Sequence, residues 1–268
     1  MFTLELEKKQ QENIYHIISH EFKMPITIIR SAIDVFERYD KLGKLDDLDL
    51  NNYIPAMRRN CDRLIKLIQN IVDIAYPTIT TDTMNMEFAN LPQIAELIIN
   101  EIKTNEKFSD VHFEIKEQGE IASLVCNIEK IEQIFLNLIS NSIKYSEENA
   151  KILFNFSSDE EYVIMRLENN SPPIAKDLAE KIFEPFFRNH NLTTEGTGLG
   201  LAIVKKNAEA HGGNIYLDTS FKKGCAFIMK LPLNLDKSKT LKQTFHHCNS
   251  LRNSVEIELS NAIIKKIS

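Results

Sequence analysis

The densest run of glycine in the chain lies at residues 194–206, which read TEGTGLGLAIVKK. Three of the 8 glycines, Gly196, Gly198 and Gly200, fall here, directly before an apolar run that favours a helix. Glycine permits positive φ and close approach of the backbone. A glycine-rich turn that leads into a helix directs free backbone N–H groups at an anion, for which a nucleotide phosphate is the natural candidate. An ordinary turn that binds nothing shares this pattern, because short glycine motifs match by chance.

A second segment places polar side chains on one helical stripe. Residues 131–146 read IEQIFLNLISNSIKYS, with apolar residues at helical spacing. Asn137, Asn141 and Lys144 recur at i, i+4 and i+7, so they share another stripe of the same helix. Amide oxygens suit Mg²⁺ and an ammonium group suits phosphate, so the stripe could hold a metal–phosphate. A solvated polar face is the alternative.

A third segment, HIISHEFKMPIT at residues 16–27, combines a helical pattern with an internal proline and a His–Glu pair. A neutral imidazole can accept a phosphoryl group on nitrogen near pH 7, which makes His20 a candidate nucleophile. Pro25 cannot donate a hydrogen bond to the carbonyl of Glu21, and we expect it to kink the helix. Taken alone, a surface His and Glu are usually only solvated side chains. His16, in the same helix, is a histidine that we expect to be no more than that.

Four segments together resemble the sensor histidine kinases of two-component systems, over about residues 5–233. SHEFKMPIT is similar to that family's phosphoacceptor box, and NLISNSIKYS to its asparagine box. IFEPFFR, residues 182–188, resembles its phenylalanine box, and EGTGLGLAIVK resembles its second glycine box. The order and spacing of the boxes fit the family, and four boxes in register are highly specific.

The resemblance implies an ATP-dependent protein-histidine kinase that phosphorylates itself on His20 and passes the phosphoryl group to an aspartate of a response-regulator receiver domain. It implies ATP and Mg²⁺ as cofactors, with Asn141 and Asn137 as metal ligands. Glu21 would orient the imidazole, and Arg188 could neutralise γ-phosphate charge. The predicted nucleotide-binding residues are Asn137, Asn141, Lys144, Tyr145, Asn169, Ile174, Gly196, Thr197, Gly198, Leu199 and Gly200.

The first glycine box departs from the family pattern. It usually reads Asp-x-Gly-x-Gly, and its Asp accepts a hydrogen bond from the adenine amino group, whereas residues 169–174 here read NNSPPI. Asn169 can still accept that bond, but without charge. A neutral hydrogen bond contributes about 1 kcal/mol and a charged one roughly 1.5–3 kcal/mol, so we expect weaker ATP binding rather than none.

Met24 is a second departure, because the family usually places Thr or Asn four residues after the phosphoacceptor His. In the family that residue positions the water that hydrolyses phospho-aspartate on the response regulator. A thioether cannot orient this water, so we expect feeble phosphatase activity.

Two predicted helices at the start of the chain carry apolar heptads over residues 5–42 and 50–75. Sustained heptads require a partner helix, so we expect the hairpin to dimerise into a four-helix bundle. A hairpin that packs on its own second domain is the alternative. The rows of residues spaced by seven are Ile14, Glu21, Ile28, Val35 and Leu42, and then Ile54, Cys61, Ile68 and Ala75.

The second half alternates helical and strand-like patterns, with polar residues 184–197 predicted as a mobile lid. Helices are predicted at 91–103, 128–145 and 198–211, and strands at 111–116, 151–156, 162–168, 214–218 and 226–232. Helices with a mostly antiparallel or mixed sheet imply an α/β sandwich, and the resemblance adds the gyrase-type ATPase fold.

We divide the chain into a dimerisation and phosphoacceptor hairpin (1–76), a linker (77–90), an ATP-binding domain (91–233) and an unassigned, weakly amphipathic tail (234–268).

Composition is that of a globular protein. The 268 residues suffice for about two domains, with 43% apolar and 26% charged residues. A net charge of −6 gives no electrostatic reason to expect a nucleic acid or an anionic membrane as partner. Four scattered cysteines without a CxxC pair indicate reduced thiols of a cytoplasmic protein. No apolar run is long enough to span a bilayer, so we expect no transmembrane segment in this chain.

The leading hypothesis is therefore a cytoplasmic, homodimeric histidine kinase core. The alternative is a non-catalytic dimeric scaffold, whose altered first glycine box would mark a degenerate ATP site. The Asn137, Asn141 and Lys144 stripe and the glycine turn argue against the scaffold. A third hypothesis, a gyrase-type ATPase outside signalling, gives no role to His20 and does not explain the heptads.

Overall fold

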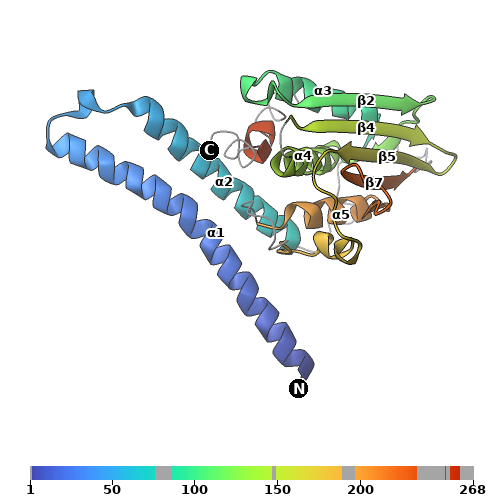
Figure 1. Cartoon of the computed structure of the whole chain (residues 1–268), viewed down its shortest axis with the longest axis horizontal. Coiled ribbons are helices and arrows are strands. Elements are labelled where there is room, and N and C mark those ends of the chain that lie inside the picture. The colour runs from blue at the N-terminus through green and yellow to red at the C-terminus, as the bar shows by residue number, and fades with distance from the viewer. Residues whose placement is uncertain are drawn as a thin grey trace.

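A hairpin of two long helices leads into a sheet covered by helices (Figure 1). The computed structural model describes residues 2–75, 86–146, 149–188, 197–233, 251 and 254–259. Helix α1 covers Phe2–Lys41 and α2 covers Leu50–Ala75, which confirms the two helices predicted from the heptads. Pro25 lies inside α1. Helix α2 also packs against α5 (Gly200–Ala210), so its second half reaches the sheet-and-helix unit.

The main sheet has five strands in the order β2-β4-β5-β7-β6. Strands β2 and β4 are parallel, and the other neighbouring pairs of this sheet are antiparallel, so the predicted mixed sheet is confirmed. The strands are β2 (His112–Gln118), β4 (Lys151–Ser158), β5 (Tyr162–Asn169), β6 (Asn214–Leu217) and β7 (Cys225–Pro232).

Helices α3 (Leu91–Lys103), α4 (Ile128–Tyr145) and α5 cover one face of this sheet (Figure 1). Alternate residues of β4 and β5 are buried, the pattern of a sheet with one face against a core. Phe135 of α4 packs on Phe154 and Phe156 of β4, with ring centroids 5.7 and 6.4 Å apart. The α/β sandwich expected from the alternating pattern is confirmed.

One strand pair was not predicted. Strand β1 (Glu87–Ala89), in the stretch interpreted as linker, pairs antiparallel with β3 (Leu124–Cys126). Each strand has three residues, too few for a period-two pattern to show. The rest of that stretch up to residue 85, the middle of the predicted lid with Gly196, and most of the tail lie outside the described residues.

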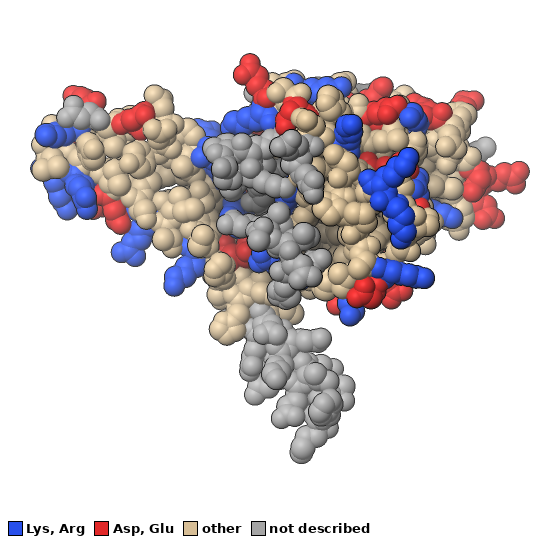
Figure 2. Space-filling view, in the orientation of Figure 1, with Lys and Arg blue, Asp and Glu red and all other residues tan. Residues whose placement is uncertain are grey.

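Charges of both signs are interspersed over the face seen in Figure 2. Among the helices of the described segments, none is both long enough and apolar enough to cross a membrane.

Candidate functional site

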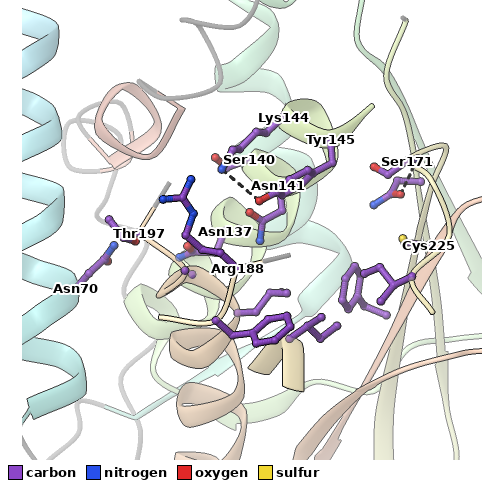
Figure 3. A pocket seen from close by; sticks show the side chains of 18 of the residues that line it. Asn70, Asn137, Ser140, Asn141, Lys144, Tyr145, Ser171, Arg188, Thr197 and Cys225 are labelled. Carbon is purple, nitrogen blue, oxygen red and sulfur yellow. Dashed lines mark hydrogen bonds between the residues drawn. The ribbon is translucent and has the colours of Figure 1, made fainter. Parts of the chain in front are cut away.

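A polar stripe of α4 lines a cavity bounded by α2, α5 and the loop that follows β5 (Figure 3). The apolar face of α4 is buried in the core, so Asn137, Asn141 and Lys144 face the cavity. Tyr145 lines it too, and its hydroxyl accepts a hydrogen bond from Lys144 Nζ at 3.3 Å. The structure thus brings together the α4 side chains that were selected from their spacing.

Glycine at position 200 lets the start of α5 approach two of these amides. A Cβ on Gly200 would lie 2.7 Å from Asn137 Oδ1 and 3.7 Å from Asn141 Nδ2. Asn137 is buried and its Nδ2 donates to the carbonyl of Gln133 at 2.9 Å, which leaves Oδ1 directed toward Gly200. Amide oxygens suit Mg²⁺, and the unpaired N–H groups of a first helical turn suit phosphate.

Gly198 joins the glycine turn to the phenylalanine box. Its φ is +72°, and a Cβ there would lie 2.6 Å from the carbonyl oxygen of Phe187. Its own carbonyl accepts a hydrogen bond from Phe186 N–H at 3.0 Å. Thr197 Oγ1 accepts from the buried Leu199 N–H at 3.2 Å. The turn therefore requires glycine at 198 for both its backbone angle and its space.

The loop after β5 forms the opposite end of the cavity. Asn169 is 6% exposed, donates through Nδ2 to Ser142 Oγ at 2.8 Å and accepts at Oδ1 from Ser171 N–H at 3.0 Å. These two bonds fix its amide in one orientation. Ser171 Oγ is buried and has no partner within the described part of the chain, so it is available to a ligand.

Apolar groups and one thiol complete this end. Ile174 and Pro172 line the cavity, and Cys225 Sγ donates to the carbonyl of Pro172 at 3.2 Å. Burial raises the pKa of the Cys225 thiol to about 11, against a smaller opposite effect of the Ile174 backbone. The thiol is therefore neutral near pH 7, and this end of the cavity suits an uncharged, flat group such as a nucleobase.

Positive side chains from three parts of the chain surround the middle of the cavity. They are Lys144 on α4, Lys66 on α2 and Arg188 at the end of the phenylalanine box (Figure 3 shows Lys144 and Arg188). Burial lowers the pKa of Lys144, Tyr145 partly offsets this, and the charges of Arg188 and Lys66 lower it further. A bound polyanion would relieve this repulsion, so the middle of the cavity favours a negatively charged group such as phosphate.

The turn of α1 that carries His20 borders the same cavity. Glu21 is 5% exposed and accepts a hydrogen bond at Oε2 from Arg63 Nη2, 2.9 Å away. Its Oε1 lies 3.8 Å from Arg188 Nη1. His20 itself is exposed and lies outside the cavity lining, one residue from its wall.

Helix α2 contributes cavity residues that the sequence analysis did not select. Arg63, Lys66 and Asn70 line the cavity, and together with Asn60 they are buried. Their spacing of three or four residues is a helical stripe, but in the sequence the apolar heptad rows of the same helix are the more prominent pattern.

Asp73 holds the end of α2 against the helices of the cavity. Its carboxylate accepts hydrogen bonds from Lys130 Nζ at 3.0 Å and Gln133 Nε2 at 2.7 Å, and its carbonyl accepts one from Lys206. Gln133 Oε1 accepts from Asn207 Nδ2 at 2.9 Å, which extends the network from α4 to α5.

Comparison with known proteins agrees with this arrangement. Residues 10–77 match the His Kinase A (phospho-acceptor) domain, and residues 126–235 match the histidine kinase-, DNA gyrase B- and HSP90-like ATPases. The sensor histidine kinase WalK of Bacillus subtilis strain 168 is 29% identical over 238 residues, which cover 85% of this chain and 38% of that protein. A WalK of Staphylococcus aureus is 26% identical over 234 residues, 85% of this chain and 55% of that one.

Solved structures give the same result. The catalytic domain of the histidine kinase ThkA is 30% identical, with a TM-score of 0.50 over 56% of this chain and 99% of that one. ThkA in complex with the response regulator protein TrrA is 25% identical, with a TM-score of 0.63 over 88% of this chain and 68% of that one. Fold and cavity define a gyrase-type ATPase domain attached to a phosphoacceptor hairpin. The chain belongs to the sensor histidine kinases, and it spans about 38% of the length of the first curated relatives it matches.

Proposed function

We propose that this chain is the kinase core of a two-component system. ATP binds the cavity, the γ-phosphoryl group moves to His20, and from there it passes to an aspartate of a response-regulator receiver domain. The observation that carries the proposal is the meeting of cavity and phosphoacceptor turn, since Glu21, next to His20, lines the cavity and lies 3.8 Å from Arg188. The ThkA structure, whose partner is a response regulator protein, supports the class of partner.

The chemistry requires positioning and charge neutralisation more than covalent work by the protein. A nitrogen of His20 attacks the γ-phosphorus, the bond to the bridging oxygen breaks, and ADP leaves with the electron pair. Lys144 and Arg188 neutralise the phosphates. Asn141 and Asn137 would hold Mg²⁺, which adds to this neutralisation when bound.

Because His20 lies outside the cavity lining, transfer within one chain requires the hairpin to move relative to the cavity. That movement would separate Glu21 Oε1 from Arg188, whereas the Glu21–Arg63 ion pair lies within the hairpin and would move with it. Oε1 would then be free to orient the imidazole and accept its other proton.

A homodimer belongs to the same proposal. In the single chain the heptad positions Ile28, Leu42, Ile54 and Ile68 are between 40% and 63% exposed. A four-helix bundle of two hairpins would cover such side chains. Exposed apolar rows on both helices are what a dimerisation surface requires.

The domain boundaries and the location are also proposed. The family matches at 10–77 and 126–235 support a hairpin of residues 1–76 and an ATP-binding domain of 91–233, with β1 inside the linker of 77–90. A cytoplasmic location is supported by the free thiols of Cys61, Cys126 and Cys225 and by the use of ATP.

The test is incubation with γ-labelled ATP and Mg²⁺, scoring acid-labile, base-stable label on the protein. We expect label on the wild type and on His16→Ala, a matched control because His16 is an exposed histidine of the same helix. His20→Ala should carry none. Equal labelling of the His20→Ala variant would reject His20 as the acceptor. Dimers without label in any variant would favour the non-catalytic scaffold.

A further inference from the structure

A short helix near the end of the chain, residues 254–259, lies between α2 and α4 (Figure 1, red). It comes after the stretch that matches the ATPase family, which ends at residue 235. Leu251, Val255 and Leu259 are 7%, 5% and 0% exposed and belong to the core cluster of the ATPase domain. Their spacing of four residues puts them on one face of a helix, so this segment docks through an apolar face.

The polar side of the same segment meets the cavity. Glu258 is buried, and its carboxylate lies 2.6 Å from Lys66 Nζ. Lys66 Nζ also donates to the carbonyl of Glu258 at 2.8 Å, and Ser140 Oγ donates to that carbonyl at 3.2 Å. Lys66 and Ser140 both line the nucleotide cavity, one from α2 and one from α4.

Lys66 is also close enough to Lys144 to lower the pKa of that amine. A Lys66 released from Glu258 would therefore face the same phosphates as Lys144. In the docked arrangement the Lys66 ammonium group is paired with the carboxylate of Glu258 instead of with a phosphate. The anion at this position then comes from the chain itself.

We propose that Leu251 and the helix of residues 254–259 form an intramolecular docking segment that competes with ATP for Lys66. The proposal rests on the proposed function, because it concerns the same nucleotide cavity. Docking holds α2 against α4 and weakens ATP binding, and ATP binding favours release of the segment. One charge on the segment opposes docking. Burial raises the pKa of Asp62 on α2, the negative charge of Glu256 raises it further, and Arg58 lowers it. Glu256 and Asp62 therefore repel each other when the segment is docked.

Docking is measured on the full chain with a zero-length carbodiimide, which joins an ammonium to a carboxylate in contact. We expect a Lys66–Glu258 cross-link, identified by mass spectrometry, whose yield falls as Mg·ATP is added. Glu256→Gln is the matched control, because it removes a carboxylate from the same helix but keeps the link. No cross-link in the wild type, or a yield that saturating, demonstrably bound ATP leaves unchanged, would overturn the proposal.

Competition is measured as the dissociation constant of Mg·ATP. We expect Glu258→Gln to lower it at least fivefold, whereas Glu256→Gln should not lower it to that extent. Lys66→Gln should weaken ATP binding more in the Glu258→Gln background than in the wild type. In that background Lys66 no longer pairs with Glu258 and contributes fully to ATP binding, so its removal costs more affinity. Equal effects in both backgrounds would refute the competition. A cross-link with no ATP binding by any variant would reject the competition together with the proposed function, whereas ATP binding without a cross-link would reject the docking alone.

Discussion

At the scale of single residues, Asn169 shows how the cavity accommodates a departure from its family. Its Nδ2 donates to Ser142 Oγ, and the Ser142 hydroxyl donates onward to the carbonyl of Leu138 at 2.8 Å. An aspartate at 169 would need the Ser142 proton to turn toward it. That cost is small, because the Leu138 carbonyl lies within α4 and keeps its helical hydrogen bond.

We therefore expect Asn169→Asp to tighten Mg·ATP binding. A charged acceptor in place of a neutral one gains about 0.5–2 kcal/mol, or about 2- to 30-fold in the dissociation constant. Isothermal titration would measure it. Asn170→Asp is the control, since it adds the same charge at a side chain that braces Ser146 and Lys151 outside the cavity. An unchanged or weaker affinity of the Asn169→Asp variant would contradict this reading.

Gly198 gives a second prediction at this scale. An alanine there would be strained by φ of +72° and would meet the backbone of Phe187 at 2.6 Å. Positive φ alone costs roughly 1–2 kcal/mol, and relief of the clash must separate the glycine turn from the phenylalanine box. We expect Gly198→Ala to raise the dissociation constant of Mg·ATP at least about tenfold.

The control for this substitution is Gly212→Ala. Gly212 has nearly the same φ, +73°, but its nearest contact for a Cβ is a Pro232 side-chain atom at 3.5 Å, and it lies away from the cavity. Both variants should lose thermal stability, but only Gly198→Ala should lose affinity. Comparable losses of affinity would show that backbone strain acts globally and that the turn has no local role.

At the scale of elements, His211 connects the two helices that build the cavity. It lies at the end of α5, is 2% exposed, and accepts at Nε2 from Asn127 N–H, at the start of α4, at 3.0 Å. Nδ1 must then carry the proton, and it donates to the carbonyl of Asn207 at 2.6 Å. Burial lowers the pKa of His211, and Lys130 lowers it further against the effect of the Asn207 bond.

This histidine predicts a pH dependence of stability. Between its lowered folded pKa and its ordinary value near 6.5, the unfolded chain binds a proton that the folded chain does not. Stability from the neutral ring is therefore complete above about pH 6.5 and falls as the pH drops below it, by at most about 1.4 kcal/mol per pH unit. We expect His211→Gln to be less stable at pH 7.5 and to lose less on acidification.

Chemical unfolding at pH 7.5, 6.5 and 5.5 would measure the difference. His112→Gln is the control, because His112 is an exposed histidine of β2. If the His211→Gln variant keeps the full wild-type slope, another group carries the pH dependence.

Elements with a clear period were predictable from the sequence. Helices α2, α3 and α4 begin and end where the pattern placed them, because Asn90 and Asn127 cap α3 and α4 and the apolar faces are long. The pair β1–β3 was not predictable, since each strand is too short to show alternation and is fixed by tertiary pairing. Tertiary packing also explains which parts of the site were predictable. Spacing within α4 predicted the polar stripe of that helix, but Lys66 reaches the cavity only because α2 packs against it.

At the scale of the whole molecule, the hairpin serves two surfaces at once. One stripe of α2, with Arg63, Lys66 and Asn70, is buried against the cavity. Another stripe of the same helix leaves Ile54 and Ile68 47% and 51% exposed. The heptads allowed two arrangements, a dimeric four-helix bundle and a hairpin packed on its own second domain. Helix α2 has a surface for each, because it packs on its own ATPase domain and still presents an uncovered apolar row.

We expect Ile68→Glu to separate a homodimer into monomers. A symmetric interface would lose the residue twice, which costs about 3–6 kcal/mol and raises the dimer dissociation constant more than about a hundredfold. Sedimentation velocity across a concentration series measures this. Leu97→Glu is the matched control, because Leu97 on α3 is 54% exposed but lies outside the hairpin. Since Ile68 faces away from the cavity, ATP affinity should persist in the monomer, which separates assembly from nucleotide binding. A wild-type monomer would reject the homodimer, and an Ile68→Glu dimer of unchanged strength would place the interface on another face of the chain.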